Sequence, residues 1–165
     1  MICPVCKHDN LEGLDNCENC NADLRTADIP QPHNAFESRL MTDHISELSP
    51  REPFTVSPDE PIASAIALMQ RERIGCVPVI SDGDLVGIFT ERDALLKLAT
   101  RSLDGITVKD VMTPDPVALR REDTPAVALH KMAVGGFRHI PLVEEGRLTG
   151  IISARDIFRH VISIL

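Results

Sequence analysis

The sequence predicts an α+β fold: two copies of one β-α-β-β-α unit that share a core, preceded by a small four-cysteine module. Three observations predict this fold. A nine-residue stretch occurs twice, as LVGIFTERD at residues 85–93 and LTGIISARD at residues 148–156. The match extends without a gap over residues 45–99 and 108–162, with eleven of 55 positions identical, which indicates an internal duplication. Finally, four of the five cysteines lie within the first 20 residues.

Composition narrows the possible functions. The 165 residues carry a net charge of −8 and include no Trp or Tyr, which disfavours a broad nucleic-acid-binding face. No apolar run approaches the ~20 residues that a membrane-spanning helix needs. The N-terminus lacks the charged-then-apolar pattern of a signal peptide. We therefore expect a cytoplasmic protein that contacts no membrane.

Two Cys-x-x-Cys pairs, ten residues apart, mark residues 1–25 as a metal-binding module. The proposed ligands are Cys3, Cys6, Cys17 and Cys20. Four thiolates suit tetrahedral zinc. So few apolar residues cannot form a core alone, so we expect metal binding to contribute most of the folding free energy. Two disulfides, or a rubredoxin-like iron or redox site, remain alternatives.

This stretch resembles the short zinc-ribbon family, although Lys7 and Asn21 stand where that family usually has Gly. With four cysteines available, we expect His8 to be exposed and not a ligand. The ribbon carries two basic side chains against five acidic ones, the wrong sign for phosphate contacts. We therefore expect a structural ribbon or one that contacts a protein partner, with nucleic acid as the less favoured partner.

Residues 26–44 contain two prolines and no clear period, which predicts an extended linker. Phe36, Leu40 and Met41 have helical spacing and allow a short helix that docks on the main domain. His33 and His44 are interpreted as solvated.

The first copy spans residues 45–104. It predicts an extended segment at 53–56, a helix from about 62 to 73, a buried strand at 76–80, and a second strand at 85–89 after the turn Asp82-Gly83. Thr90 opens the closing helix. Cys76 is expected in the core.

The second copy spans residues 105–165. It predicts an extended segment at 117–119, a helix from Thr124-Pro125 to about 134 that ends at the glycines 135–136, strands at 139–143 and 148–152, and a last helix opened by Ser153. One copy alone leaves an apolar sheet face open, and two copies can cover each other.

Residues 45–162 resemble a tandem pair of CBS domains. The matching pieces are the strands VPVI and IPLV, the turns DG and EG, and the endings GIFTERD and GIISARD. The resemblance implies a disc-like homodimer packed through helices, and clefts that take an adenosyl ligand and draw on both repeats.

A hydroxyl precedes an acid by three residues in Thr90/Asp93 and in Ser153/Asp156. The simpler interpretation is a helix capping box. The functional one is that the carboxylate, which only accepts hydrogen bonds, binds a ribose diol, while the hydroxyl and the first helical N–H groups hold a phosphate. Both interpretations stay open here.

The resemblance assigns further residues to each cleft. One cleft would use Ile88, Thr90, Asp93, Ala118, Phe137 and Arg138. The other would use Ile151, Ser153, Asp156, Thr55, Ile74 and Gly75. Because the first contains an aromatic ring and an arginine, we expect it to bind more tightly.

The sequence thus predicts a non-catalytic regulatory module that binds AMP, ADP, ATP or S-adenosylmethionine and relays this to a partner. No nucleophile–base set stands out. A zinc-ribbon transcription regulator that contacts nucleic acid, and a ligand-free CBS scaffold for protein interaction, are the alternatives.

Overall fold

The computed structural model describes residues 1–25 and 32–163; residues 26–31, part of the predicted linker, and residues 164–165 lie outside this description. The helices and strands, in chain order, are α1 (Ala35–Thr42), the 3-10 helix η1 (Ile45–Leu48), α2 (Ile62–Glu72), β1 (Cys76–Ser81), β2 (Asp84–Thr90), α3 (Glu91–Leu98), α4 (Val108–Val111), β3 (Thr113–Pro114), α5 (Pro125–Gly135), β4 (His139–Glu144), β5 (Arg147–Ser153) and α6 (Ala154–Ile162).

Both predicted hairpins are present and have the same register. β1 pairs antiparallel with β2, β4 pairs antiparallel with β5, and each pair has an irregularity at the equivalent position. The turns 82–83 and 145–146 have positive φ at both residues. That conformation matches the right-handed twist of the flanking strands. Duplication of the sequence is therefore duplication of one hairpin-centred unit.

The extended segments predicted at 53–56 and 117–119 are not full strands, because each forms only one β-bridge. Val56 forms a single parallel bridge with Val79, and Leu119 forms one with Leu142. Val56 makes two backbone hydrogen bonds to β1, and Leu119 makes two to β4, so the two segments occupy equivalent places in the repeats.

The two repeats exchange their opening segments. Ile45 of η1 is buried in the second repeat, whereas Val108 and Val111 of α4 are buried in the first. Likewise β3, which belongs to the second repeat, pairs with β2 of the first. The buried side chains therefore form two clusters, each completed by residues of the other repeat.

The end of the predicted linker is the helix α1. Asn34 caps it by accepting a hydrogen bond from the N–H of Glu37 (2.8 Å). The helix lies against α5 and α6, and Leu40 packs on the core of the second repeat. His44 is exposed as expected, although its Nδ1 lies 2.7 Å from the carbonyl oxygen of Glu122.

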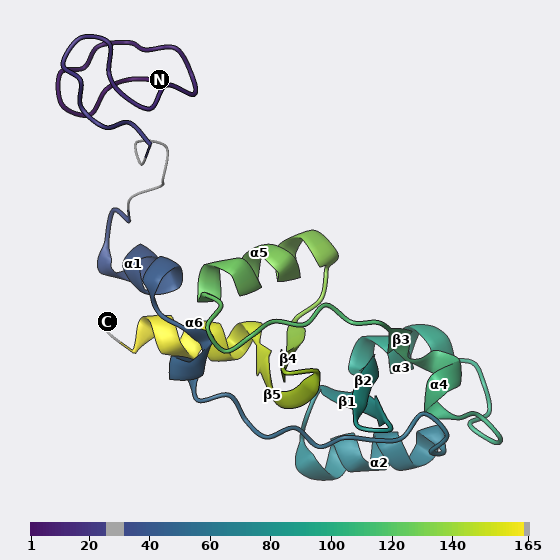
Figure 1. Ribbon diagram of the computed structural model, residues 1–165. Coiled ribbons are helices and arrows are strands. Elements are labelled where there is room, and N and C mark those ends of the chain that lie inside the picture. Colours follow the sequence, from purple (N-terminus) through teal and green to yellow (C-terminus); the bar gives the residue numbers. More distant parts are fainter. Residues whose placement is uncertain (26–31, 164–165) are drawn as a thin grey trace.

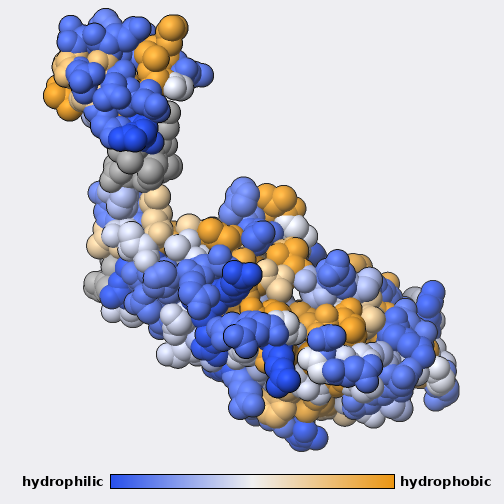
Figure 2. All heavy atoms as spheres, viewed as in Figure 1, coloured by the Kyte–Doolittle hydropathy of each residue, from blue (hydrophilic) through white to orange (hydrophobic). Residues whose placement is uncertain are grey.

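The arrangement places the strands between helices. In Figure 1, α5 and α2 lie on opposite sides of the strands, and β2 and β5 approach each other where the repeats meet. Figure 2 shows apolar residues (orange) across the middle of this face, between polar margins. Within residues 1–25 and 32–163, no helix has both the length and the apolar character to span a membrane.

Candidate ligand and metal sites

The four N-terminal cysteines form one cluster. Their sulfur atoms all lie within 4.8 Å of one another. The Sγ–Sγ distance is 3.7 Å for Cys3–Cys20 and 3.6 Å for Cys6–Cys17. A zinc tetrahedron with Zn–S bonds of ~2.3 Å has edges of ~3.8 Å, so the sulfurs have the spacing that zinc requires. The cysteines are free thiols, too far apart for the ~2.05 Å bond of a disulfide.

Two equivalent turns hold these cysteines. The N–H of Lys7 donates to the carbonyl of Cys3 (3.0 Å), and the N–H of Asn21 donates to the carbonyl of Cys17 (2.8 Å). Lys7 and Asn21 have φ of 63° and 57°, so they supply the left-handed conformation that Gly usually supplies. Burial alone would raise the pKa of the Cys17 thiol, but the N–H groups of Cys20 and Asn19 lower it to about 6.

The ribbon has almost no apolar core. Its buried apolar residues are Cys3, Cys17 and Leu24. Asn10 is buried and bonds the two halves together: its side chain donates to the carbonyl of His8 (3.0 Å) and accepts from the N–H of Glu18 (3.0 Å). His8 itself is exposed, as the sequence predicted. The donor set and spacing fit a structural metal held by the four cysteines.

Both hydroxyl–acid pairs form complete capping boxes. Thr90 caps α3, and Oδ2 of Asp93 accepts hydrogen bonds from the N–H (3.0 Å) and hydroxyl (2.7 Å) of Thr90. Ser153 caps α6, and Oδ2 of Asp156 accepts from the N–H (2.8 Å) and hydroxyl (2.6 Å) of Ser153. The capping interpretation is therefore correct. Each capping box uses only Oδ2 of its carboxylate.

The second oxygen of Asp93 is occupied. Lys97, one turn along α3, places Nζ 2.8 Å from Oδ1, and the hydroxyl of Thr113 in β3 donates to the same atom (3.2 Å). Asp93 is buried, with 11% relative exposure of its side chain. Burial alone would raise its pKa, but hydrogen bonds from Lys97 and Thr90 outweigh that effect and hold the pKa below the ordinary value.

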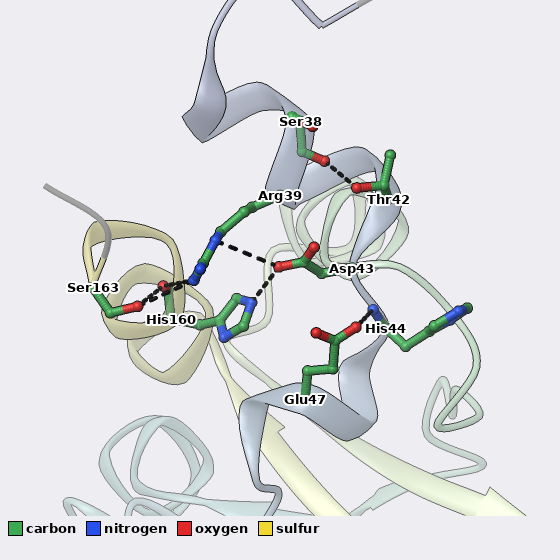
Figure 3. A network of polar contacts seen from close by, with 8 residues as sticks. All are labelled: Ser38, Arg39, Thr42, Asp43, His44, Glu47, His160 and Ser163. Carbon is green, nitrogen blue, oxygen red and sulfur yellow. Dashed lines mark hydrogen bonds and ion pairs between the residues drawn. The ribbon is translucent and has the colours of Figure 1, made fainter.

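The second oxygen of Asp156 has different surroundings. Within the part of the chain that the structure describes, no group donates a hydrogen bond to Oδ1 of Asp156. The residues equivalent to Lys97 and Thr113 are His160 and Pro50. Pro50 carries no donor. His160 turns to α1 instead, with Nε2 2.6 Å from Oδ2 of Asp43, as Figure 3 shows.

The remaining predicted residues lie around the junction of the repeats. Ile88 is buried in β2 beside Thr113, and Ile151 in β5 is bridged by Arg51. Thr55 and Ala118 are exposed, each next to the residue that bridges to the central strand.

The residues just before β1 and β4 lie against the first turns of α3 and α6, respectively. The carbonyl of Gly75 accepts from the N–H of Glu91 and that of Arg138 accepts from the N–H of Ala154, both at 3.0 Å. Phe137 is half-buried against the core of the second repeat, and the side chain of Ile74 packs on the first.

The two repeats meet at Gly75. A Cβ placed on Gly75 would lie 3.3 Å from Cε1 of His139 and 3.4 Å from Oε2 of Glu91. Burial lowers the pKa of His139, and the negative charges of Asp156 and Glu91 oppose this. Burial raises the pKa of Cys76 to about 12, so Cys76 is a core residue, as predicted, with little thiolate at neutral pH.

One contact bridges the repeats directly. The guanidinium of Arg92, at the start of α3, donates to the carbonyl oxygen of Gly136 at the end of α5 (2.6 Å). Gly136 adjoins Phe137 and Arg138, which the sequence assigned to the Asp93 cleft. The equivalent Arg155 is exposed.

Two surface hollows each include one of the predicted ligand-binding residues. One, of about 600 Å³, lies beside the two hairpin turns and includes Thr55; its charged lining residues are Glu52, Asp82, Asp84, Glu145 and Arg147. The second, of about 580 Å³, lies between α2 and α3 and includes Ile74 and Glu91.

Sequence reasoning missed Lys97, Thr113 and Glu91 as neighbours of the site. Lys97 had a detectable signal, because it follows Asp93 by four residues, the spacing at which helical side chains meet. Thr113 gave none, since its contact depends on the exchange of opening segments.

The fold and the paired capped acids define a class: a tandem module of two pseudo-symmetric repeats that meet along their strands. The CBS domain family matches residues 45–100 and 108–163, and the chain belongs to this family as a tandem CBS pair preceded by a four-cysteine ribbon.

Curated relatives agree with this assignment. An uncharacterized 17.7 kDa protein of Acidianus ambivalens is 32% identical over 126 residues, covering 75% of this chain and 76% of that one. The CBS domain-containing protein YhcV of Bacillus subtilis is 34% identical over 104 residues, covering 62% and 74%. Inosine-5'-monophosphate dehydrogenase of Korarchaeum cryptofilum is 38% identical over 109 residues, but the match covers only 22% of that enzyme.

Solved structures show the same fold. The CBS-domain containing protein ATU1752 from Agrobacterium tumefaciens has a TM-score of 0.64 and 36% identity, covering 70% of this chain and 94% of that one. CBSX2, solved in complex with AMP, has a TM-score of 0.66 and 25% identity, covering 73% and 97%.

Proposed function

We propose that this protein is a non-catalytic regulatory module. Its CBS pair binds an adenosyl ligand between the repeats and relays the bound state to a protein partner. The observation that carries this proposal is the placement of Asp156, which caps α6 beside the junction of the two repeats. The CBSX2 structure supports the ligand class, because that protein, which has the same fold, was solved in complex with AMP.

Each part of the site has a role in this proposal. A carboxylate oxygen accepts hydrogen bonds from the ribose hydroxyls, and the capping hydroxyl with the free N–H groups of the first turn faces a phosphate or its equivalent. Ile88 and Ile151 supply apolar walls. Arg138 is exposed beside α6 and supplies positive charge for phosphate or carboxylate.

The bound state would be passed on through thermodynamic linkage, because ligand binding and the packing of the two repeats depend on each other. A ligand that contacts both repeats stabilises the arrangement it binds, by about 2.7 kcal/mol at 100 times its dissociation constant. Because η1 and α4 are exchanged, a change at the junction reaches the cores of both repeats. The zinc-bearing ribbon, whose Ile2, Val5 and Leu11 are exposed, is the proposed protein contact.

A thermal-shift screen tests the proposal. The full chain is heated with AMP, ADP, ATP, S-adenosylmethionine and 5'-methylthioadenosine, with GMP and CMP as controls for the base. We expect at least one adenosyl compound to raise Tm in a concentration-dependent way while the controls do not. If none does at millimolar concentration, the CBS pair acts as a ligand-free scaffold.

We also propose a homodimer packed through the helices. The most exposed large apolar side chains of the helices are Leu95 and Leu96 on α3, Val134 on α5 and Phe158 on α6. Leu95 and Phe158 are equivalent positions of the two repeats, so this one exposed apolar pair follows the pseudo-symmetry of the module. A groove between α2 and α3 lies beside this surface and includes the half-buried Ile66.

A further inference from the structure

The carboxylates of the two repeats differ in how many hydrogen bonds they already accept. An ionised carboxylate has about four acceptor positions, two on each oxygen. Asp93 accepts from the N–H and hydroxyl of Thr90, from Lys97 and from Thr113. Its acceptor positions are filled by the protein, so a ribose diol would have to displace a lysine or a hydroxyl to bind there.

The partners of Asp93 also tie the repeats together. Thr113 belongs to the second repeat, and the ammonium of Lys97 donates in addition to the carbonyl of Val111 (2.7 Å), at the end of α4 from the second repeat. Arg92 adds the bond to Gly136. Three side chains of α3 therefore hold segments of the second repeat in place.

Asp156 has the complementary pattern. Its Oδ2 completes the capping box, while Oδ1 accepts no bond from the residues that the structure describes. Pro50 replaces the threonine donor, and His160 is held by Asp43. Its capping partner Ser153 pairs with His139, and a Cβ on Gly75 of the first repeat would lie 3.3 Å from Cε1 of His139, so the capping box lies close to the junction of the repeats.

We infer that the two acids have divided roles. Asp93 is a structural tie between the repeats, and each chain binds one adenosyl ligand, whose ribose diol donates to Oδ1 of Asp156. This rests on the proposed function and reverses the ranking of the clefts that Phe137 and Arg138 favoured in the sequence. The division comes from two substitutions between the repeats, lysine to histidine and threonine to proline.

The test compares Asp156→Asn with Asp93→Asn in the full chain. Isothermal titration uses AMP and 2'-deoxy-AMP, which lacks one diol donor. We expect one site per wild-type chain and weaker binding of 2'-deoxy-AMP by about tenfold, the worth of one hydrogen bond to a charged group. Asp156→Asn binds both compounds equally weakly. Asp93→Asn keeps the preference for AMP and the single site.

Thermal unfolding without ligand provides the second arm. Asp93→Asn loses the charge that Lys97 and Thr113 bond, so Tm falls by about 3 °C or more. In Asp156→Asn the new amide side chain can keep its carbonyl oxygen on Ser153 and turn its NH₂ group to the open side, so Tm stays near that of the wild type.

The outcomes are distinguishable. If Asp93→Asn abolishes binding while Asp156→Asn leaves it intact, or if two equal sites appear, the division of roles is wrong although the module still binds adenosyl ligands. Equal losses of Tm in both variants would overturn the structural role of Asp93. If none of AMP, ADP, ATP, S-adenosylmethionine and 5'-methylthioadenosine binds, the proposed function falls with the ligand half of the inference, and the Tm comparison still decides the structural half.

Discussion

Asp93 caps its own helix through Thr90 and also accepts a hydrogen bond from Thr113 of the second repeat. It therefore contributes to the stability of the whole repeat pair. Its lowered pKa means that the folded state binds the proton less tightly than the unfolded chain does. Such a group stabilises the fold fully above its unfolded pKa, near the ordinary 3.8, and loses that contribution as pH falls through the folded value.

The first prediction concerns this pH dependence. The difference in unfolding free energy between wild type and Asp93→Asn is expected to be about 1–3 kcal/mol and constant between about pH 6 and pH 8. It shrinks below about pH 4, where the wild-type carboxyl becomes protonated. Urea denaturation at stepped pH measures it. A difference that grows on acidification would contradict the assigned sign.

The second prediction concerns Gly87 of β2, which pairs with Pro114 of β3. A Cβ at Gly87 would lie 2.5 Å from Sδ of Met112 and 3.1 Å from the carbonyl oxygen of Thr113. We expect Gly87→Ala to lower the unfolding free energy by about 1–3 kcal/mol, as overpacking does. Gly150→Ala is the matched control, since its nearest contacts are side-chain atoms at 3.2 Å and 3.3 Å, and it should cost less. Equal losses would mean that the β3 crossing tolerates displacement.

The capping boxes at residues 90–93 and 153–156 were predictable because each joins a hydroxyl to an acid three residues later, within one helical turn. The partners of Oδ1 were not, because Thr113 reaches Asp93 only after β3 has crossed to the other repeat. A difference of one residue between repeats, threonine against proline, changes the site without altering the motif that identifies it.

At the scale of elements, α1 is fastened to α6 by a polar cluster (Figure 3). Asp43 lies 2.6 Å from Nε2 of His160, with side-chain exposures of 19% and 13%. Arg39 donates to the carbonyl of His160 (3.3 Å) and to the hydroxyl of Ser163 (3.2 Å). The helix thereby joins the segment that follows the ribbon to the helix that carries Asp156.

The third prediction is a coupling energy between Asp43 and His160. A double-mutant cycle with both residues changed to Ala, measured by urea denaturation, should give about 1 kcal/mol, because the pair is largely buried. The exposed pair Lys109–Asp59, also at 2.6 Å but with exposures of 54% and 75%, is the control and should give less. Additive effects of the Asp43 and His160 changes would show that α1 is held by apolar contacts alone.

Hairpins, turns and long helices could be predicted from local sequence patterns, as the register of β1–β2 and β4–β5 illustrates. The exchange of η1 and α4 could not, because four-residue helices carry little periodicity and their partners lie in the other repeat. Apolar residues can be counted in the sequence, but which repeat buries them is a property of the assembled pair.

At the scale of the whole molecule, the cores of the CBS pair contain no residue of the ribbon, so metal removal should affect one part only. The fourth prediction is that the purified protein contains one zinc per chain by mass spectrometry. A chelator should abolish the ordered ribbon while the main calorimetric transition keeps its Tm. Cys20→Ser should lower zinc content in the same way. Iron in place of zinc, or loss of the main transition, would contradict this.

The fifth prediction concerns oligomeric state. Leu95→Asp and Phe158→Asp should each convert the dimer to a monomer in sedimentation analysis, because a buried unpaired charge is costly at an apolar interface. Leu11→Asp, at the same 72% exposure as Leu95 but on the ribbon, is the control and should leave the dimer intact. A wild-type chain that sediments as a monomer would rule out the helical interface.

The central claim is that the two CBS repeats together bind an adenosyl ligand. Isothermal titration of the wild-type chain with AMP and with S-adenosylmethionine tests it most directly. The account predicts saturable binding of at least one of them, with one site per chain. The absence of binding by both at millimolar concentration, from protein with an intact unfolding transition, would contradict it.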